Sequence, residues 1–290
     1  MASKYVSYSQ YSQYTQCPRQ WYLNYGLGLR ENKPSINLTF GTAFHETLQN
    51  FLDVMYNKSV KEADEIDLEK DFKERFSKLY KSTSQMHKEH YSKPEELQEF
   101  YEDAVAILKY FKTHRKKYFS SKGMELVGIE FNIFTPVSQD TEVHIKGAID
   151  IITYDKVSKK YTIWDIKTST RGWGDKEKKD QTKINQILLY KRYFSELKGI
   201  PEDDIDVVFL VVRRKIYENS EFTIPRISEF KPANGKKKVK DAVESFTNFI
   251  NEVYTGEGEV NKDKEYPCNP SKLCAWCPFD NRPDLCDKNK

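Results

Sequence analysis

Two acidic residues and a lysine lie within one short segment, residues 147–169. Asp165 and Lys167 are two positions apart in a run predicted to be a β-strand, so both side chains leave the same face of that strand. Asp150 lies near the end of the preceding predicted strand. It shares this face if the two strands pair in the matching register. The segment therefore predicts two carboxylates and an ammonium group at the edge of a sheet.

This combination of groups suits the hydrolysis of a phosphodiester. Carboxylate oxygens are preferred ligands of hard divalent cations such as Mg²⁺. A bound cation polarises the phosphodiester and lowers the pKa of a bound water. The ammonium of Lys167 would orient that water or offset the charge that develops on phosphorus. The alternative is a surface hairpin with solvated charges, because Asp-x-Lys spacing is common by chance.

The residues that flank this pair favour the site over the surface hairpin. Ile163, Trp164 and Ile166 predict a buried strand, in which unpartnered Asp165 and Lys167 side chains would be costly. The same strand also takes part in an ordered series of motifs along the chain. Its members are Gly41 to Glu46 (GTAFHE), Gly147-x-x-Asp150, Trp164 to Thr168 (WDIKT) and Gln186-x-x-x-Tyr190.

This series resembles the motifs of RecB-like nucleases in the PD-(D/E)XK superfamily, in the order of that family. The resemblance implies a metal held by four groups, which are His45, Asp150, Asp165 and the backbone carbonyl of Ile166. It implies that Lys167 is the catalytic base or the water-positioning group. Gln186 and Tyr190 would order the site and meet DNA, and Glu130 is a weaker candidate for the acidic cluster. Mg²⁺ or Mn²⁺ is the expected cofactor.

Five cysteines form a second group of candidate ligands: Cys17, Cys268, Cys274, Cys277 and Cys286. Four of them lie near the end of the sequence. The odd count, together with an N-terminus that lacks the apolar stretch of a signal peptide, argues against a disulfide framework. Reduced thiols or a metal site are expected instead.

The segments around these cysteines, residues 12–25 and 266–290, resemble the iron–sulfur branch of the same nucleases, the AddB-type and CRISPR-adaptation-type exonucleases. The resemblance implies a [4Fe–4S] cluster, a group that four thiolates bind. Its ligands would be Cys17, Cys274, Cys277 and Cys286. Eight residues separate Cys277 from Cys286, more than is usual in that branch. The alternative is a structural Zn²⁺ held by Cys268, Cys274, Cys277 and Cys286, so Cys17 and Cys268 compete for the fourth position.

The pattern of apolar residues predicts a mixed α/β fold. Helices are expected at 44–55 (with Thr42 as the cap), 68–79, 97–111, 183–197 and 241–254. Strands are expected at 126–134, 143–151, 161–167 and 207–212, with an edge strand at 221–227. We expect a restriction-endonuclease-like mixed sheet in a single nuclease domain, residues 1–290. This domain would consist of a helical insertion (about 46–120), a catalytic core (about 121–230) and a cysteine-ligated terminal subdomain.

Composition excludes some classes of function and leaves the choice of substrate to local features. The formal charge of +3 arises from 47 basic and 44 acidic residues, which is too even to indicate nucleic acid by itself. No apolar run approaches the roughly 18 residues that a membrane span needs, and no P-loop is present. Arg213 and Arg214 follow a predicted buried strand, so they are the best candidates for phosphate contacts. Tyr190 could add base stacking.

The sequence therefore predicts a cytoplasmic deoxyribonuclease of prokaryotic or phage origin, with an exonuclease expected. Its partners would be single-stranded DNA or duplex ends, with recombination or replication proteins, and no membrane. The process would be recombination, repair or phage DNA metabolism. Two rivals remain. One is a non-catalytic DNA-binding or assembly subunit on the same fold, and the other is a zinc-stapled interaction protein.

Overall fold

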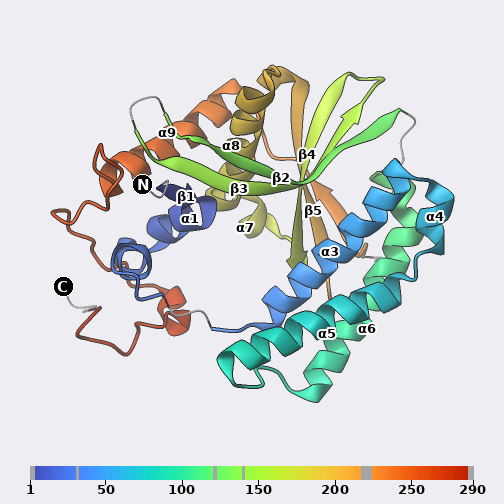
Figure 1. Ribbon diagram of the computed structural model, residues 1–290, viewed down its shortest axis with the longest axis horizontal. Coiled ribbons are helices and arrows are strands. Elements are labelled where there is room, and N and C mark those ends of the chain that lie inside the picture. Colours follow the sequence, from blue (N-terminus) through green and yellow to red (C-terminus); the bar gives the residue numbers. More distant parts are fainter. Residues whose placement is uncertain (1–3, 31–32, 120–122, 139–140, 217–223, 287–290) are drawn as a thin grey trace.

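A mixed β-sheet forms the centre of the protein (Figure 1). The computed structural model describes residues 4–30, 33–119, 123–138, 141–216 and 224–286. Within these ranges the sheet has six strands, which are β1 (Tyr5–Ser7), β2 (Met124–Pro136), β3 (His144–Asp155), β4 (Lys160–Ser169), β5 (Ile205–Arg213) and β6 (Ile227–Phe230). The mixed α/β fold with a restriction-endonuclease-like sheet is thereby confirmed.

The pairing of the strands is antiparallel except at two places. β2 pairs with β3, β3 with β4, and β5 with β6, each in antiparallel orientation. β4 and β5 are parallel, and α8 (Gln181–Lys198) lies between them in the sequence. β1 pairs in parallel with the first three residues of β3. Every residue of β5 from Val207 to Val212 is buried, because helices cover both faces of the sheet there.

Helices cover the sheet on two sides (Figure 1). One side carries α3 (Ile36–Asn57), α4 (Val60–Glu65), α5 (Leu68–His87) and α6 (Pro94–His114). The other side carries α1 (Tyr8–Gln16), α8 and α9 (Lys236–Val253). Each side encloses its own apolar core. The shorter elements are α2 (Pro18–Trp21), η1 (Tyr22–Gly26), η2 (Arg115–Lys117), α7 (Asp175–Lys178), η3 (Glu202–Asp204) and η4 (Lys272–Trp276).

The expected helices are present with shifted ends, and so are the expected strands up to β5, but several further elements were not expected. The prediction that Thr42 caps a helix was wrong, because α3 begins at Ile36 and Gly41 lies inside it. A β-carbon at Gly41 would lie 3.3 Å from Thr168 Oγ1, so the bare glycine lets α3 approach β4 closely. The elements that were not expected include β1, α1, α4 and α7. The expected edge strand lies in part outside the described residues, and β6 begins at Ile227.

No helix in the described part of the chain combines the length and the apolar character that a membrane crossing requires.

Arg214 joins the helical layer to the end of β5. Its guanidinium is buried and lies 2.7 Å from Asp103 Oδ2 and 2.9 Å from Glu99 Oε1, both on α6. It also stacks 3.9 Å above the ring of Phe100. A DNA contact by Arg214 would have to compete with these two carboxylates. Arg213, the preceding residue, has no ion pair among the described side chains.

Substitution of these two neighbouring arginines should therefore affect stability unequally. We expect Arg214→Met to lower the free energy of unfolding by roughly 2 kcal/mol, since it leaves Asp103 without its shorter partner. Arg213→Met should change it by less than about 0.5 kcal/mol. Urea denaturation of both variants measures this difference. Equal losses would contradict the structural role of Arg214.

Candidate active site

The site forms where two neighbouring strands of the sheet separate. β3 and β4 are paired from Asp155 and Lys160 up to Ile151 and Trp164, and their pairing ends there. Asp150 and Asp165 are the next residues on the two strands. Beyond this point β4 stays paired with β5 along its other edge. The two carboxylates therefore lie at the opening between the parted strands.

Asp165 and Lys167 form a buried ion pair on β4. The Asp165 side chain is 3 % exposed, and its Oδ2 lies 2.8 Å from Lys167 Nζ. Burial raises the pKa of Asp165, although the Lys167 charge acts in the opposite direction. Burial alone would lower the pKa of Lys167, but the Asp165 carboxylate outweighs it and the pKa is raised. Lys167 is therefore an ammonium ion near neutral pH.

Asp150 and His45 meet on the other side of the opening. Asp150 Oδ2 accepts a hydrogen bond of 2.6 Å from the backbone N–H of Ile166, and it lies 3.7 Å from His45 Nδ1. Burial, and then the charge of Asp165, raise the pKa of Asp150 well above its ordinary value. Burial and the nearby Lys167 charge lower the pKa of His45 to about 4. The imidazole is consequently neutral near pH 7 and has the lone pair that a metal requires.

Helix α8 closes the site from the other face of the sheet. Lys167 Nζ donates to Gln186 Oε1 at 2.9 Å, and Gln186 Nε2 donates to the Tyr190 hydroxyl at 3.2 Å. The Tyr190 ring is buried, and a β-carbon at Gly147 would lie 3.1 Å from its Cε1 atom. Gly147 is thus the position that lets the ring pack on β3. Gln186 and Tyr190 hold the ammonium of Lys167 in place.

The donor set fits a hard divalent cation. The Oδ2 atom of Asp165 is buried, and its partner within the described residues is the Lys167 ammonium at 2.8 Å. Two carboxylates with raised pKa values and a neutral imidazole are groups that a cation would stabilise. Across the described ranges, no three His, Cys, Asp or Glu side chains already stand in the arrangement of a bound metal ion.

Gln49 is a residue of this site that the sequence motifs did not indicate. It lies on α3, four residues after His45, and its side chain is buried. Its Nε2 atom donates to Glu130 Oε1 at 2.6 Å and to the Asp150 carbonyl oxygen at 3.2 Å. The signal that could have found it is the spacing, because residues four apart on a helix share a face.

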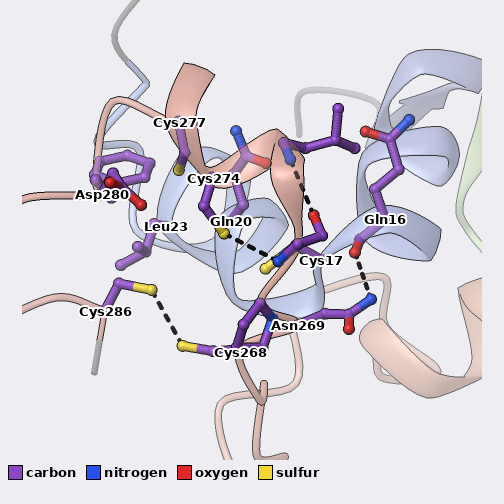
Figure 2. Close-up of a pocket in the computed structure, with 14 residues that line it drawn as sticks. Gln16, Cys17, Gln20, Leu23, Cys268, Asn269, Cys274, Cys277, Asp280 and Cys286 are labelled. Carbon is purple, nitrogen blue, oxygen red and sulfur yellow. Dashed lines mark hydrogen bonds between the residues drawn. The ribbon is translucent and has the colours of Figure 1, made fainter. Parts of the chain in front are cut away.

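The five cysteines meet in a pocket far from these carboxylates. Cys17 reaches it from the start of α2, and the other four reach it from the C-terminal segment (Figure 2). Two of these thiols, Cys268 and Cys286, are in contact, with 3.1 Å between their sulfur atoms. Hydrogen bonds from side chains to the backbone join the two segments: Arg19 Nε donates to the Leu285 carbonyl at 2.7 Å, and Asn269 Nδ2 donates to the Gln16 carbonyl at 2.8 Å. Cys17 therefore lies beside the four cysteines of the C-terminal segment.

Comparison with known proteins identifies the family to which this chain belongs. No curated protein matches the sequence of this chain. A family model described as the PD-(D/E)XK nuclease superfamily matches residues 5–282, which include every strand of the sheet and both helices that supply the site. The chain therefore belongs to the PD-(D/E)XK nuclease superfamily.

Proposed function

We propose that this protein is a metal-dependent deoxyribonuclease of the RecB-like branch, which hydrolyses phosphodiester bonds at single-stranded or duplex DNA ends. The observation that carries the proposal is the convergence of Asp150, Asp165 and Lys167 where β3 and β4 separate. The protein would be an exonuclease of a prokaryote or phage and would work in the cytoplasm. Its process would be DNA recombination, repair or phage DNA metabolism. Recombination or replication proteins would be its partners.

Four groups would hold the cation, which are His45, Asp150, Asp165 and the carbonyl oxygen of Ile166. Mg²⁺ or Mn²⁺, when bound, would polarise the phosphodiester and lower the pKa of a water. The His45, Asp150 and Lys167 side chains are 24 %, 16 % and 29 % exposed, so a phosphate can approach them from solvent. Asp165 is the buried member of the set, and it pairs with Lys167.

Lys167 would act as a positioning group more than as a base. Its raised pKa keeps it protonated, so it donates hydrogen bonds and offsets negative charge on the phosphate. Asp165 and Gln186 fix its ammonium from two sides, at 2.8 Å and 2.9 Å. This arrangement needs no reorganisation when the charge on phosphorus develops.

The DNA-binding surface would include Arg213 more readily than Arg214. The Arg213 guanidinium lies beside Gly172, in the loop that follows β4 of the site. Arg214 is engaged by two carboxylates of α6. Tyr190 is buried, so its contribution to DNA binding would pass through the ordering of Gln186 and Lys167. Phosphate contacts of this kind depend on salt and are indifferent to base sequence.

Removal of either member of the buried ion pair should abolish cleavage. We expect Asp165→Asn and Lys167→Ala each to reduce the rate on end-labelled DNA with Mg²⁺ by on the order of a thousandfold. Asp206→Asn, on β5 opposite Thr162, is the matched control, since it removes a carboxylate of the same sheet outside the site. Wild-type rates for both ion-pair variants would refute the assignment. A wild-type protein that binds DNA without cutting it would indicate the non-catalytic subunit.

The raised pKa of Asp150 predicts that its carboxylate destabilises the metal-free protein at neutral pH. A carboxyl group whose folded pKa exceeds its ordinary value of 3.8 gives stability at low pH that is lost as the pH rises through the folded pKa. Asp150→Asn cannot ionise and should keep this stability. We therefore expect its melting temperature to exceed that of the wild type at pH 8, and the gap to shrink toward pH 5.

Thermal melts at both pH values, with chelator and then with Mn²⁺, measure this effect. A gap of 1 kcal/mol corresponds to about 2–4 °C in a chain of this size. Mn²⁺ should raise the melting temperature of the wild type more than that of Asp150→Asn. A variant that is less stable than the wild type at pH 8 without metal would count against this account of the site.

The same proposal includes a [4Fe–4S] cluster bound by Cys17, Cys274, Cys277 and Cys286. The support is the single pocket that these residues line, with Cys17 reaching it from the opposite end of the sequence. Four thiolates suit such a cluster, and its role would be structural. Cys268 lines the same pocket, so the zinc alternative has its four thiols there as well.

The fourth ligand can be identified by paired substitutions of Cys17 and Cys268. If the cluster is bound, anaerobically purified protein should be brown and contain iron and sulfide. Cys17→Ala should lose both and melt at a lower temperature, because the bound group closes a loop of nearly the whole chain. Cys268→Ala should keep them. Colourless protein with one zinc per chain, sensitive to Cys268→Ala and not to Cys17→Ala, would show the zinc site instead.

A further inference from the structure

Glu130 lies at the active site although none of the nuclease motifs contains it. The pairs Ile129 with Ile151 and Phe131 with Ile149 place Glu130 directly opposite Asp150 on the neighbouring strand. The charge of Glu130 contributes to the raised pKa of both Asp150 and Tyr190. Glu130 is therefore a third acid at the opening, on the side away from Asp165.

The backbone at Glu130 has a conformation that strands do not normally contain. Its φ angle is +47°, in the left-handed region, which non-glycine residues rarely adopt. Such a conformation persists only where the surrounding contacts hold it, and it is common at functional sites. The ladder of β2 is interrupted at this residue and resumes at Phe131.

Gln49 fixes the carboxylate in this position. Its two amide hydrogens are used by two acceptors, Glu130 Oε1 at 2.6 Å and the Asp150 carbonyl at 3.2 Å. Since both partners only accept, the orientation of the amide is determined. Gln49 thus ties α3, which carries His45, to β2 and β3 at once.

A purely structural role of Glu130 would explain its contact with Gln49 of α3, but it would not explain why its carboxylate has no ion pair among the described residues. Glu130 is exposed, and no lysine or arginine in the described part of the chain forms an ion pair with it. Glu125, on the same strand and away from the site, is paired with Lys156. A carboxylate that is held rigidly, opens to solvent and lacks a cation is suited to bind one.

We infer that Glu130 is a further acidic ligand of the divalent cations at this site, and that Gln49 is the positioning residue that holds it. The inference rests on the proposed metal-dependent nuclease function and deepens it. Glu130 would bind a cation directly or through a water, on the solvent side of Asp150. Gln49 would act only through Glu130 and the backbone of Asp150.

Calorimetric titration of the full-length protein with Mn²⁺ alone, without DNA, tests this inference. Glu130→Gln keeps the size of the side chain and an acceptor for Gln49, and removes only the charge. We expect this substitution to raise the dissociation constant for Mn²⁺ by on the order of tenfold. If the wild type binds two Mn²⁺ ions, one of the two binding events should be lost instead. Glu125→Gln is the matched control, with the same charge change on the same strand, and should titrate like the wild type.

The role of Gln49 is tested in the same titrations. Gln49→Leu keeps the charge of Glu130 but removes the hydrogen bond that holds its carboxylate. It should therefore also weaken Mn²⁺ binding, by a smaller factor. If Gln49 acts through Glu130, the double variant should bind Mn²⁺ as Glu130→Gln does, because the two effects are not additive. The positioning role of Gln49 would be overturned if the losses of Mn²⁺ affinity in the two single variants add up in the double variant. It would also be overturned if the loss in Gln49→Leu only parallels a lower melting temperature.

The outcomes separate this inference from the nuclease proposal. Wild-type Mn²⁺ affinity in Glu130→Gln, with binding abolished by Asp165→Asn, would overturn the role of Glu130 alone. A wild-type protein that binds no Mn²⁺ would overturn both proposals. Weakened binding in Glu130→Gln, with unchanged binding in Glu125→Gln and an unchanged melting temperature, is the result that supports the inference.

Discussion

The separation of β3 and β4 beyond Ile151 and Trp164 is the constraint on which the site depends. Strands that stayed paired would direct their polar groups at each other and leave no room for a substrate. Once they part, the Ile166 N–H takes the carboxylate of Asp150 as its partner, at 2.6 Å. The same parting brings a second carboxylate, Asp165, into a buried position beside it. The pKa values of both acids rise as a result.

The opening between β3 and β4 lowers the stability of the fold, because strand pairing is lost and two acids lie close together. Packing of the helices on both faces of the sheet compensates for this loss. α3 comes from the core on one face and supplies His45 and Gln49, whereas α8 comes from the core on the other face and supplies Gln186 and Tyr190. Each helix buries one face in the apolar core on its own side of the sheet, and this packing anchors it. Strain and like charges at the centre are tolerated where packed elements on both sides fix the geometry.

The sequence predicted those parts of this arrangement that have a local signal. The alternation of apolar and charged residues around Asp165 and Lys167 predicted the strand. The spacing of four between Gln186 and Tyr190 predicted that both lie on one face of a helix. β1 was missed because three residues, Tyr5–Ser7, become a strand only through pairing with β3. The start of α3 was misplaced because glycine usually marks a helix end, while Gly41 serves close packing against Thr168.

Other features were hidden because they join residues that are distant in the sequence. The bond between Gln49 and Glu130 spans 81 positions, and no local pattern distinguishes it. Arg213 and Arg214 illustrate a related limit. Adjacent residues at the end of a strand point to opposite sides, and only the position of α6 decides which arginine is buried. Charge runs in a sequence therefore identify a region of positive charge, but not which of its members faces solvent.

The cysteine pocket and the opening between β3 and β4 are connected by an unbroken series of contacts. Trp21, four residues after Cys17, packs against Phe249 of α9 with 5.8 Å between ring centroids. Phe249 also contacts Tyr11 of α1, whose hydroxyl accepts a hydrogen bond from Asn185 of α8 at 3.3 Å. The next residue, Gln186, holds Lys167. A group bound by these cysteines would thus stabilise the layer of helices that positions the ammonium of Lys167.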